Sequence, residues 1–262
     1  MCRFVAYLGP PRSLQELLVD PPHSLLRQSY APRHQRHGVV NADGFGVGWY
    51  DPAVRPEPAR HRTEKPMWAD RTFASLAGVV RSSAVLAAVR SATPPAPVEE
   101  SGAPPFTWGP WLFAHNGAVD GWRGGEDGGE DGGEDSGVGT AIRRLVPDRW
   151  AAGIEGAADS EVLFALALSR LADGTGPAVA LASVVQAVTE LAEARLNMVL
   201  MDAATITATA WGDSLWVLDG PDGRVVASEP SDDDGSWVQV ADRSLVRADA
   251  VSLDVGPIPG TP

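Results

Sequence analysis

Cysteine is almost absent from this chain. Cys2 is the only cysteine in 262 residues, so no disulfide can form within the chain and a zinc site built from several thiolates would lack ligands. A lone cysteine is most often a small buried apolar side chain. That interpretation is weaker at position 2, because removal of the initiator Met1 would place the thiol beside a free α-amine. Any thiol chemistry therefore depends on Cys2.

Lysine and long apolar runs are also scarce. Lys65 is the only lysine, and the net charge is −13, with 21 Lys and Arg against 34 Asp and Glu. Binding to a phosphate backbone needs clustered basic residues, so we expect no nucleic-acid partner. No apolar run reaches the roughly 18 residues of a membrane span, and Pro10 and Pro11 interrupt the N-terminal stretch too early for a signal peptide. We therefore expect a cytoplasmic protein with no membrane partner.

An acidic, glycine-rich segment carries much of the negative charge. The tetrapeptide Gly-Gly-Glu-Asp occurs three times between Gly124 and Ser136. Glycine and like-charge repulsion together predict a disordered surface loop over residues 124–139. The segment does not match the spacing of a calcium-binding EF-hand loop, so we expect a solvated insertion and no metal site.

The order of helix and strand patterns predicts one α+β domain over residues 1–262. Ser13 and Glu16 have the spacing of a capping box, which predicts a short helix ending before Pro21. Asp43-Gly44 predicts a turn into a strand. Further strands are expected at 3–8, 85–89, 111–114, 196–201, 205–211, 215–218 and 224–228, and helices at 159–171 and 177–194. Strands followed by helices and then by an antiparallel meander indicate layers of sheets and helices.

Cys2 at a mature N-terminus would carry its own base. An α-amine has a pKa of roughly 7.7–8.0, so part of it is neutral near pH 7 and can accept the thiol proton. A papain-like Cys–His pair is the alternative, with His34, His37 or His115 as the base. None of these histidines stands in a recognisable family signature.

Three further positions add to a candidate amide-cleaving site. Arg90 ends an apolar strand and suits two-pronged capture of a carboxylate, although it could equally be a surface arginine. Asn116 and Gly117 could both donate to one oxyanion, although Asn-Gly is also a common turn. Asp159 begins a helix, where it could bind substrate or simply act as an N-cap.

These motifs together resemble a known family. The segments MCRFVAYLG, NADGFGVGWY, VRSAT, AHNGAV and DSEVLFALAL occur in the order found in class II glutamine amidotransferases. The resemblance implies the four-layer αββα sandwich of N-terminal-nucleophile hydrolases. It also implies roles for five residues: Cys2 as nucleophile, Arg90 as ligand of the glutamyl α-carboxylate, Asn116 and Gly117 as oxyanion hole, and Asp159 as ligand of the α-amine.

A closer resemblance covers nearly the whole chain. Segments such as DPPHSLLRQSYAPR, TATAWGDSLWV and VVASEPSDDD are similar to the amidohydrolases of ergothioneine biosynthesis. Those enzymes remove glutamate from γ-glutamyl-hercynylcysteine sulfoxide, so the resemblance implies a stand-alone hydrolase with a small γ-glutamyl substrate and no cofactor. Phe4 departs from relatives that carry His there. The alternatives are a glutaminase, acting alone or supplying ammonia to a synthase, and an inactive binding protein.

The leaving group of such a substrate would contain a trimethylammonium cation. Aromatic faces and carboxylates bind such groups, and the chain has nine Trp. Trp211 and Trp216 flank an expected turn, and Glu229 follows the next strand. We expect at least one of these Trp, with Glu229, to line the cation end of the site. The alternative is that both Trp fill the core.

Overall fold

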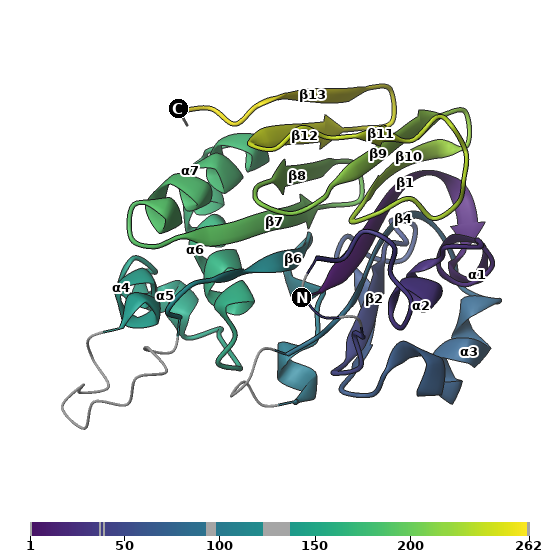
Figure 1. The fold of residues 1–262 in the computed structure, drawn as a ribbon, viewed down its shortest axis with the longest axis horizontal. Helices are drawn as coiled ribbons and strands as arrows, with labels where there is room; N and C mark the ends of the chain where they lie inside the picture. Colours follow the sequence, from purple (N-terminus) through teal and green to yellow (C-terminus); the bar gives the residue numbers. More distant parts are fainter. Residues whose placement is uncertain (1, 37, 39, 93–97, 123–136, 261–262) are drawn as a thin grey trace.

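The computed structural model describes residues 2–36, 38, 40–92, 98–122 and 137–260, so residues 124–136 of the expected loop at 124–139 lie outside the described residues. Two sheets form the centre of the molecule (Figure 1), and neighbouring strands in both are antiparallel. The seven-stranded sheet has the order β11 (Val238–Gln239), β9 (Trp216–Gly220), β10 (Gly223–Ala227), β1 (Arg3–Ser13), β4 (Arg81–Val89), β2 (Phe45–Trp49), β3 (Ala59–Thr63). The six-stranded sheet has the order β13 (Leu253–Pro257), β12 (Ser244–Ala248), β8 (Ile206–Ala210), β7 (Ala194–Met201), β6 (Trp111–Val119), β5 (Phe106–Trp108).

Helices lie on the two sides of the molecule (Figure 1). On the seven-stranded sheet, α1 (Leu14–Leu18) and α2 (Leu25–Gln28) pack against β1 and β4, and α3 (Arg71–Ala77) packs against α1. On the six-stranded sheet, α6 (Asp159–Ala172) packs against β6 and α7 (Pro177–Thr189) against β7 and β8. The short helices α4 (Val138–Arg144) and α5 (Asp148–Ala151) pack against α6.

The alternation of side chains along β1 shows how the layers form. Phe4, Ala6 and Leu8 are buried in the core between the two sheets, whereas Val5 and Tyr7 are buried in a second core under α1, α2 and α3. Successive side chains of a strand point to opposite faces, so a strand that is apolar on both faces must be covered on both. A third core joins the six-stranded sheet to α6 and α7. The four-layer αββα sandwich of antiparallel sheets flanked by helices is therefore confirmed.

Local signals in the sequence predict several element boundaries correctly and others wrongly. The capping box of Ser13 and Glu16 is present at the start of α1. The last expected helix ends at Thr189, not at residue 194. Val138 already begins α4, so the expected loop at 124–139 extends too far at its C-terminal end. In the part of the chain that the structure describes, no helix is long and apolar enough to span a membrane.

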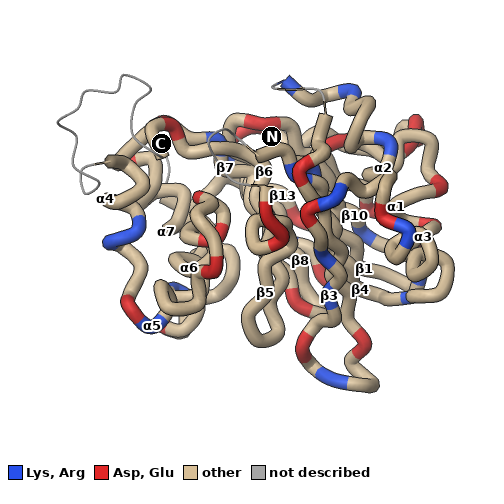
Figure 2. Tube along the Cα trace, turned by 90° about the horizontal axis from the view of Figure 1, so that it is seen from below, with Lys and Arg blue, Asp and Glu red and all other residues tan. Residues whose placement is uncertain are grey.

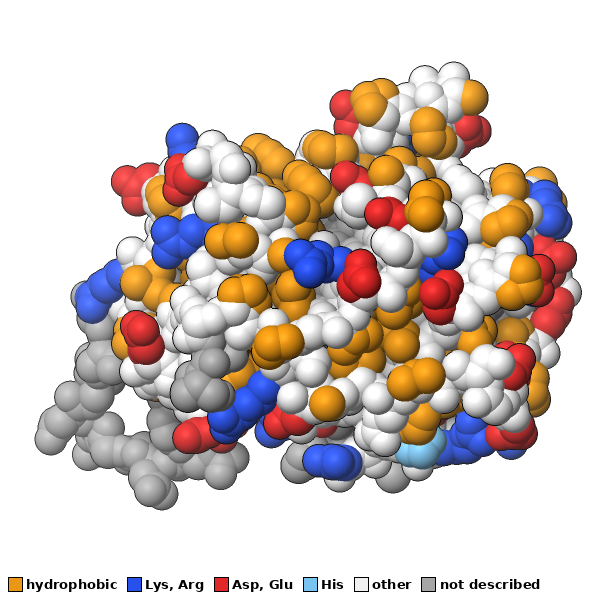
Figure 3. All heavy atoms as spheres, turned by 90° about the horizontal axis from the view of Figure 1, so that it is seen from above, with side chains coloured by type: hydrophobic (Ala, Val, Ile, Leu, Met, Phe, Trp, Pro, Cys, Tyr) orange, Lys and Arg blue, Asp and Glu red, His pale blue; other side chains and the backbone are white. Residues whose placement is uncertain are grey.

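Acidic and basic residues are spread over both halves of the described chain (Figure 2). On the face drawn in Figure 3, the described acidic and basic side chains are interspersed with apolar ones. The face drawn in Figure 3 is therefore not uniformly acidic, although the net charge of the chain is negative.

Candidate active site

Cys2 and Arg90 lie opposite each other at one end of the seven-stranded sheet. The register pairs Arg3 with Val89 and Phe4 with Ala88, so the next residues, Cys2 and Arg90, continue the same ladder. Phe4 and Ala88 both face the core between the sheets. Since side chains alternate along a strand, Cys2 and Arg90 are on that same inner face, one step beyond the apolar core.

Asn116 reaches the same end of the sandwich from the six-stranded sheet. Leu112 and Ala114 on β6 face the core between the sheets, so Asn116 shares their face, and the register pairs it with Asn197 of β7. β6 contacts β1 and β4 across the interior, and the N-terminal end of β1 lies beside β6 in the middle of the molecule (Figure 1). The fold therefore brings Cys2, Arg90 and Asn116 to one end of the inner space.

The side chain of Asn116 has no partner within the described residues. It is fully buried, and neither its Oδ1 nor its Nδ2 makes a hydrogen bond. An unpartnered buried amide costs free energy, so such a group in a folded protein calls for an explanation. Asn197, directly opposite, is fully used: it donates to the carbonyl oxygens of Asp213 and Ser214 and accepts from Trp211 N. Of these two paired residues, Asn116 is thus the one whose amide has no partner within the described residues.

Gly117 is needed for a close approach between strands. A Cβ atom there would lie 1.8 Å from the carbonyl oxygen of Arg195 and 2.6 Å from Nε2 of His115. Asn116 and Gly117 lie inside β6, which continues to Val119. The prediction that this strand ends before them is therefore wrong, and the pair is not a turn.

Arg90 is nearly buried against the loop that follows the 93–97 segment. Its guanidinium packs on Gly102, where a Cβ atom would lie 2.8 Å from Cζ, and Nη1 donates to the carbonyl oxygen of Asp43 at 3.4 Å. Asp43 is tied back to the strand end, since its carboxylate accepts from Ala92 N at 2.8 Å. These contacts hold the planar guanidinium in one orientation, as two-pronged carboxylate binding requires.

Asp159 is the first residue of α6 and not its N-cap, which is Ala158. Its Oδ2 accepts from Val119 N at 3.3 Å, which ties the start of the helix to the end of β6. Its Oδ1 accepts from Ser160 N at 2.7 Å and from Ser160 Oγ at 3.1 Å. The N-cap alternative is thus wrong, and the carboxylate is fixed close to the strand that carries Asn116.

The structure does not bring Trp211 and Trp216 together. Trp211 packs against the core under α6 and α7, with the guanidinium of Arg243 5.2 Å from its ring. Trp216 packs against the core on the opposite side of the molecule, and its ring lies 5.4 Å from that of His34. Glu229 is fully buried, and its carboxylate accepts from the backbone N–H groups of Arg33 and His34. Glu229 and Trp216 are therefore linked through His34, whereas Trp211 is separate.

The histidines offered as alternative bases have other partners where they are described. Both ring nitrogens of His115 are engaged, by Ser160 Oγ and the carbonyl oxygen of Arg195, on the α6 side of β6. The His34 ring lies against Trp216. His37 lies outside the described residues. Neither described histidine is bonded to Cys2 in a Cys–His pair.

Sequence reasoning missed Arg3, which follows the thiol. It is fully buried, donates from Nε to Gln35 Oε1 at 3.2 Å, and has no hydrogen-bond partner for Nη1 or Nη2 in the described parts of the chain. Burial lowers the pKa of Arg3, while nearby Glu229 and Asp213 oppose that shift. Only its place next to Cys2 could have drawn attention to it.

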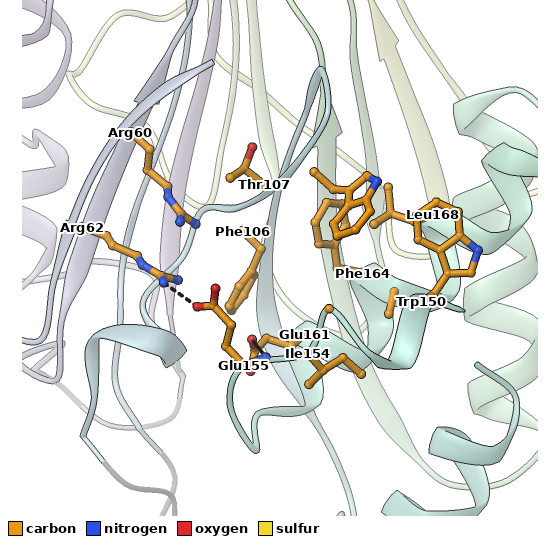
Figure 4. A pocket seen from close by; sticks show the side chains of 13 residues that line it. Arg60, Arg62, Phe106, Thr107, Trp150, Ile154, Glu155, Glu161, Phe164 and Leu168 are labelled. Atoms are coloured by element: carbon orange, nitrogen blue, oxygen red, sulfur yellow. Dashed lines mark hydrogen bonds and ion pairs between the residues drawn. The ribbon is translucent and has the colours of Figure 1, made fainter. Parts of the chain in front are cut away.

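A pocket lies apart from this end, between strands β3 and β5 and helices α5 and α6 (Figure 4). Aromatic side chains form one wall and Arg60 and Arg62 another. Arg62 donates to Glu155 at 2.6 Å and to the carbonyl oxygen of Ser101 at 3.3 Å. The 99–102 loop thus separates this pocket from Arg90. None of the site residues predicted from the sequence lines it.

Comparison with known proteins identifies the family. The model of the class II glutamine amidotransferases matches residues 19–136. The γ-glutamyl-hercynylcysteine sulfoxide hydrolase of Mycolicibacterium smegmatis is 44% identical over 98% of this chain and 100% of its own length. This chain belongs to the class II glutamine amidotransferase family. The enzyme of the same name from Mycobacterium tuberculosis is 42% identical to this amidotransferase-family chain, over 94% of the chain and 92% of its own length.

Solved structures agree with this placement. A protein described as a glutamine aminotransferase class-II domain protein, from Silicibacter pomeroyi, matches this family member with a TM-score of 0.65 and 25% identity, over 100% of both chains. The glutamine phosphoribosylpyrophosphate amidotransferase of Bacillus subtilis matches with a TM-score of 0.68 over 99% of this chain and 50% of its own. At 13% identity, the second match supports the fold alone.

Proposed function

We propose that this protein is a hydrolase that releases L-glutamate from γ-glutamyl-hercynylcysteine sulfoxide. The meeting of Cys2, Arg90 and Asn116 at one end of the inter-sheet space carries the proposal, because it supplies a nucleophile, a carboxylate ligand and an oxyanion donor together. The substrate comes from the relatives of that name, which match over almost their whole length. The reaction needs no cofactor.

The proposed reaction begins after loss of Met1. The Cys2 α-amine takes the thiol proton, and the thiolate attacks the γ-carbonyl carbon of the glutamyl group. The tetrahedral oxyanion accepts hydrogen bonds from Asn116 Nδ2 and the Gly117 N–H. The C–N bond then breaks, and the leaving amine takes the proton from the α-ammonium. Water hydrolyses the resulting thioester, with the amine again as base, and frees glutamate and Cys2.

The glutamyl end is held by its two charged groups in this proposal. Arg90 binds the α-carboxylate, because a guanidinium matches the two oxygens of a carboxylate. Asp159 binds the α-ammonium. Both side chains are already fixed by contacts to neighbouring backbone, so little ordering is needed when substrate binds.

We propose that the cation end of the substrate lies beside Trp216. Trp216 is the better of the two Trp candidates, because His34 links it to Glu229 while Trp211 already has a cation over its ring. We expect Trp216→Ala to reduce the preference for the trimethylated substrate over its histidine analogue. The comparison of kcat/KM for the two compounds measures this, with Trp211→Ala as the matched control. An unchanged preference would exclude Trp216.

A substrate panel tests the function itself. Purified protein is incubated with γ-glutamyl-hercynylcysteine sulfoxide, glutathione and glutamine, and the release of glutamate and ammonia is measured. We expect the first substrate to have the highest kcat/KM and Cys2→Ala to abolish turnover without unfolding the protein. Cys2→Ser should retain little activity, because a hydroxyl is far less acidic than a thiol.

The panel also separates the alternatives. Preferred turnover of glutamine, with ammonia release, would favour a glutaminase, which the match to the amidotransferase family also allows. No turnover of any substrate would favour a binding protein. Intact mass supplies a check, because retained Met1 would block the α-amine that the reaction needs.

A further inference from the structure

His115 and Ser160 connect the last two motifs of the site along the chain, which are 45 residues apart. His115 precedes Asn116 on β6, and Ser160 follows Asp159 at the start of α6. His115 Nδ1 lies 3.1 Å from Ser160 Oγ, and Nε2 lies 2.9 Å from the carbonyl oxygen of Arg195. The imidazole is almost fully buried, so both contacts are made away from solvent.

The hydrogen-bond chemistry assigns a direction to these contacts. A carbonyl oxygen only accepts, so Nε2 must carry the proton that is donated to Arg195. Nδ1 of the neutral imidazole then only accepts, so the single hydroxyl proton of Ser160 is shared between Nδ1 and the carboxylate of Asp159. Ser160 Oγ also lies 3.1 Å from Asp159 Oδ1. The chain of contacts therefore runs from the imidazole through Ser160 to the carboxylate of Asp159.

The carboxylate is the end point of this chain. Asp159 Oδ1 lies 4.0 Å from His115 Nδ1, while Ser160 N and Val119 N occupy one position on each oxygen. Each carboxylate oxygen has two lone pairs, and Ser160 Oγ takes the second position on Oδ1, so Oδ2 keeps room for a further donor. The backbone and Ser160 thus fix the orientation of the carboxylate without using up its capacity to accept.

We propose that His115 is a positioning residue that holds Asp159, through Ser160, for recognition of the substrate α-ammonium. This inference rests on the role of Asp159 in the proposed function. It explains why His115, which precedes Asn116 and Gly117, contacts Ser160 and Arg195 and not Cys2. The His115 side chain would then link the strand that carries Asn116 to Asp159, the proposed ligand of the substrate amine.

Three variants separate this role from simple packing. Ser160→Ala removes the bridge and leaves the imidazole. His115→Asn places an amide near the position of Nδ1 and can still contact Ser160, whereas His115→Gln places one near Nε2 and can contact only Arg195. Ser169→Ala is the matched control, because its hydroxyl on the same helix donates to the Leu166 carbonyl, away from the site.

The measurement is the preference for an α-amine. For each variant, kcat/KM is determined for γ-glutamyl-hercynylcysteine sulfoxide and for its glutaryl analogue, which lacks only the α-amine. We expect Ser160→Ala and His115→Gln to reduce the preference for the amine about tenfold or more, as expected for loss of one charge-assisted contact. His115→Asn should keep most of the preference, and Ser169→Ala all of it.

Asp159→Asn distinguishes failure of the inference from failure of the function. If Asp159→Asn keeps the preference, Asp159 does not bind the amine, and both the assignment and the inference fall. If Asp159→Asn loses the preference while Ser160→Ala and His115→Gln keep it, the inference alone is wrong. Should the His115 variants fail to fold, Ser160→Ala decides the question by itself.

Discussion

At the scale of single residues, Asn116 is the strongest test of the oxyanion hole. Its amide is buried and unpartnered in the described structure, so Asn116→Ala removes a donor without breaking an existing bond. An oxyanion exists mainly in the transition state, so we expect kcat to fall about 10²–10³-fold while KM changes little. Steady-state kinetics measure both. A pure increase in KM would contradict the assignment.

Arg90 tests recognition of the glutamyl α-carboxylate. We expect Arg90→Ala to raise KM strongly and Arg90→Lys to restore only part of the loss, because a point charge does not reproduce the planar fork that packs on Gly102. The control is a substrate whose α-carboxylate is amidated. Wild-type protein should discriminate against it, and Arg90→Ala should not. Equal turnover of both substrates by wild type would remove Arg90 from this role.

At the scale of elements, the sequence predicts the strands better than the site that they build. β1, β4 and β6 have apolar patterns that identify them as strands, and Ser13 identifies the start of α1. Asn116-Gly117 resembles a turn because this pair favours tight hairpins. Pairing with β7 keeps it extended, and only the register of two strands distant in sequence decides that.

The site residues were predictable only in part, because local patterns do not show which distant segments meet in the fold. Cys2, Arg90, Asn116 and Asp159 follow from a family resemblance that local patterns do not supply. Trp211 and Trp216 lie five residues apart around a turn, yet they pack against cores on opposite sides of the molecule. Proximity in sequence therefore does not bring the two side chains to one place, and the expectation that at least one of them lines the cation end stays a prediction.

The N-terminal turn of α6 should contribute a pH dependence to stability. Glu161 is buried, which raises its pKa, although the N–H groups of Glu155 and Gly156 oppose the shift by donating to its carboxylate. The unfolded state then loses its proton first as pH rises above the ordinary value near 4.5. Stability from this group is therefore present at low pH and is lost as pH rises through the raised pKa.

Glu161→Gln checks that sign. Wild type should lose free energy of unfolding relative to the variant as pH rises from about 4.5, with a slope of at most about 1.4 kcal/mol per pH unit for one proton. Urea unfolding at a series of pH values measures the difference, and a matched series for Ser169→Ala controls for the helix. A difference that is flat, or that grows in favour of wild type, would show that burial does not dominate at Glu161.

At the scale of the whole molecule, the core between the sheets sets the separation of the catalytic parts. Cys2 and Arg90 belong to one sheet and Asn116 to the other, and the apolar layers beneath them, including Phe4, hold the sheets apart. In this chain Phe4 fills the space with an aromatic ring, so its role is packing under the thiol.

Two cavity-forming substitutions test this division of roles. Leu86 lies in the core between the sheets and Leu181 in the core under α7, and both are fully buried. We expect Leu86→Ala and Leu181→Ala each to cost about 2–5 kcal/mol of stability. Because a displacement of about 1 Å between reacting groups can cost on the order of 10²-fold in rate, kcat should fall clearly only in Leu86→Ala. Activity is compared at a temperature where urea unfolding shows both variants folded. Equal kcat in the two would mean that the six-stranded sheet holds Asn116 in place independently of the core it shares with Cys2.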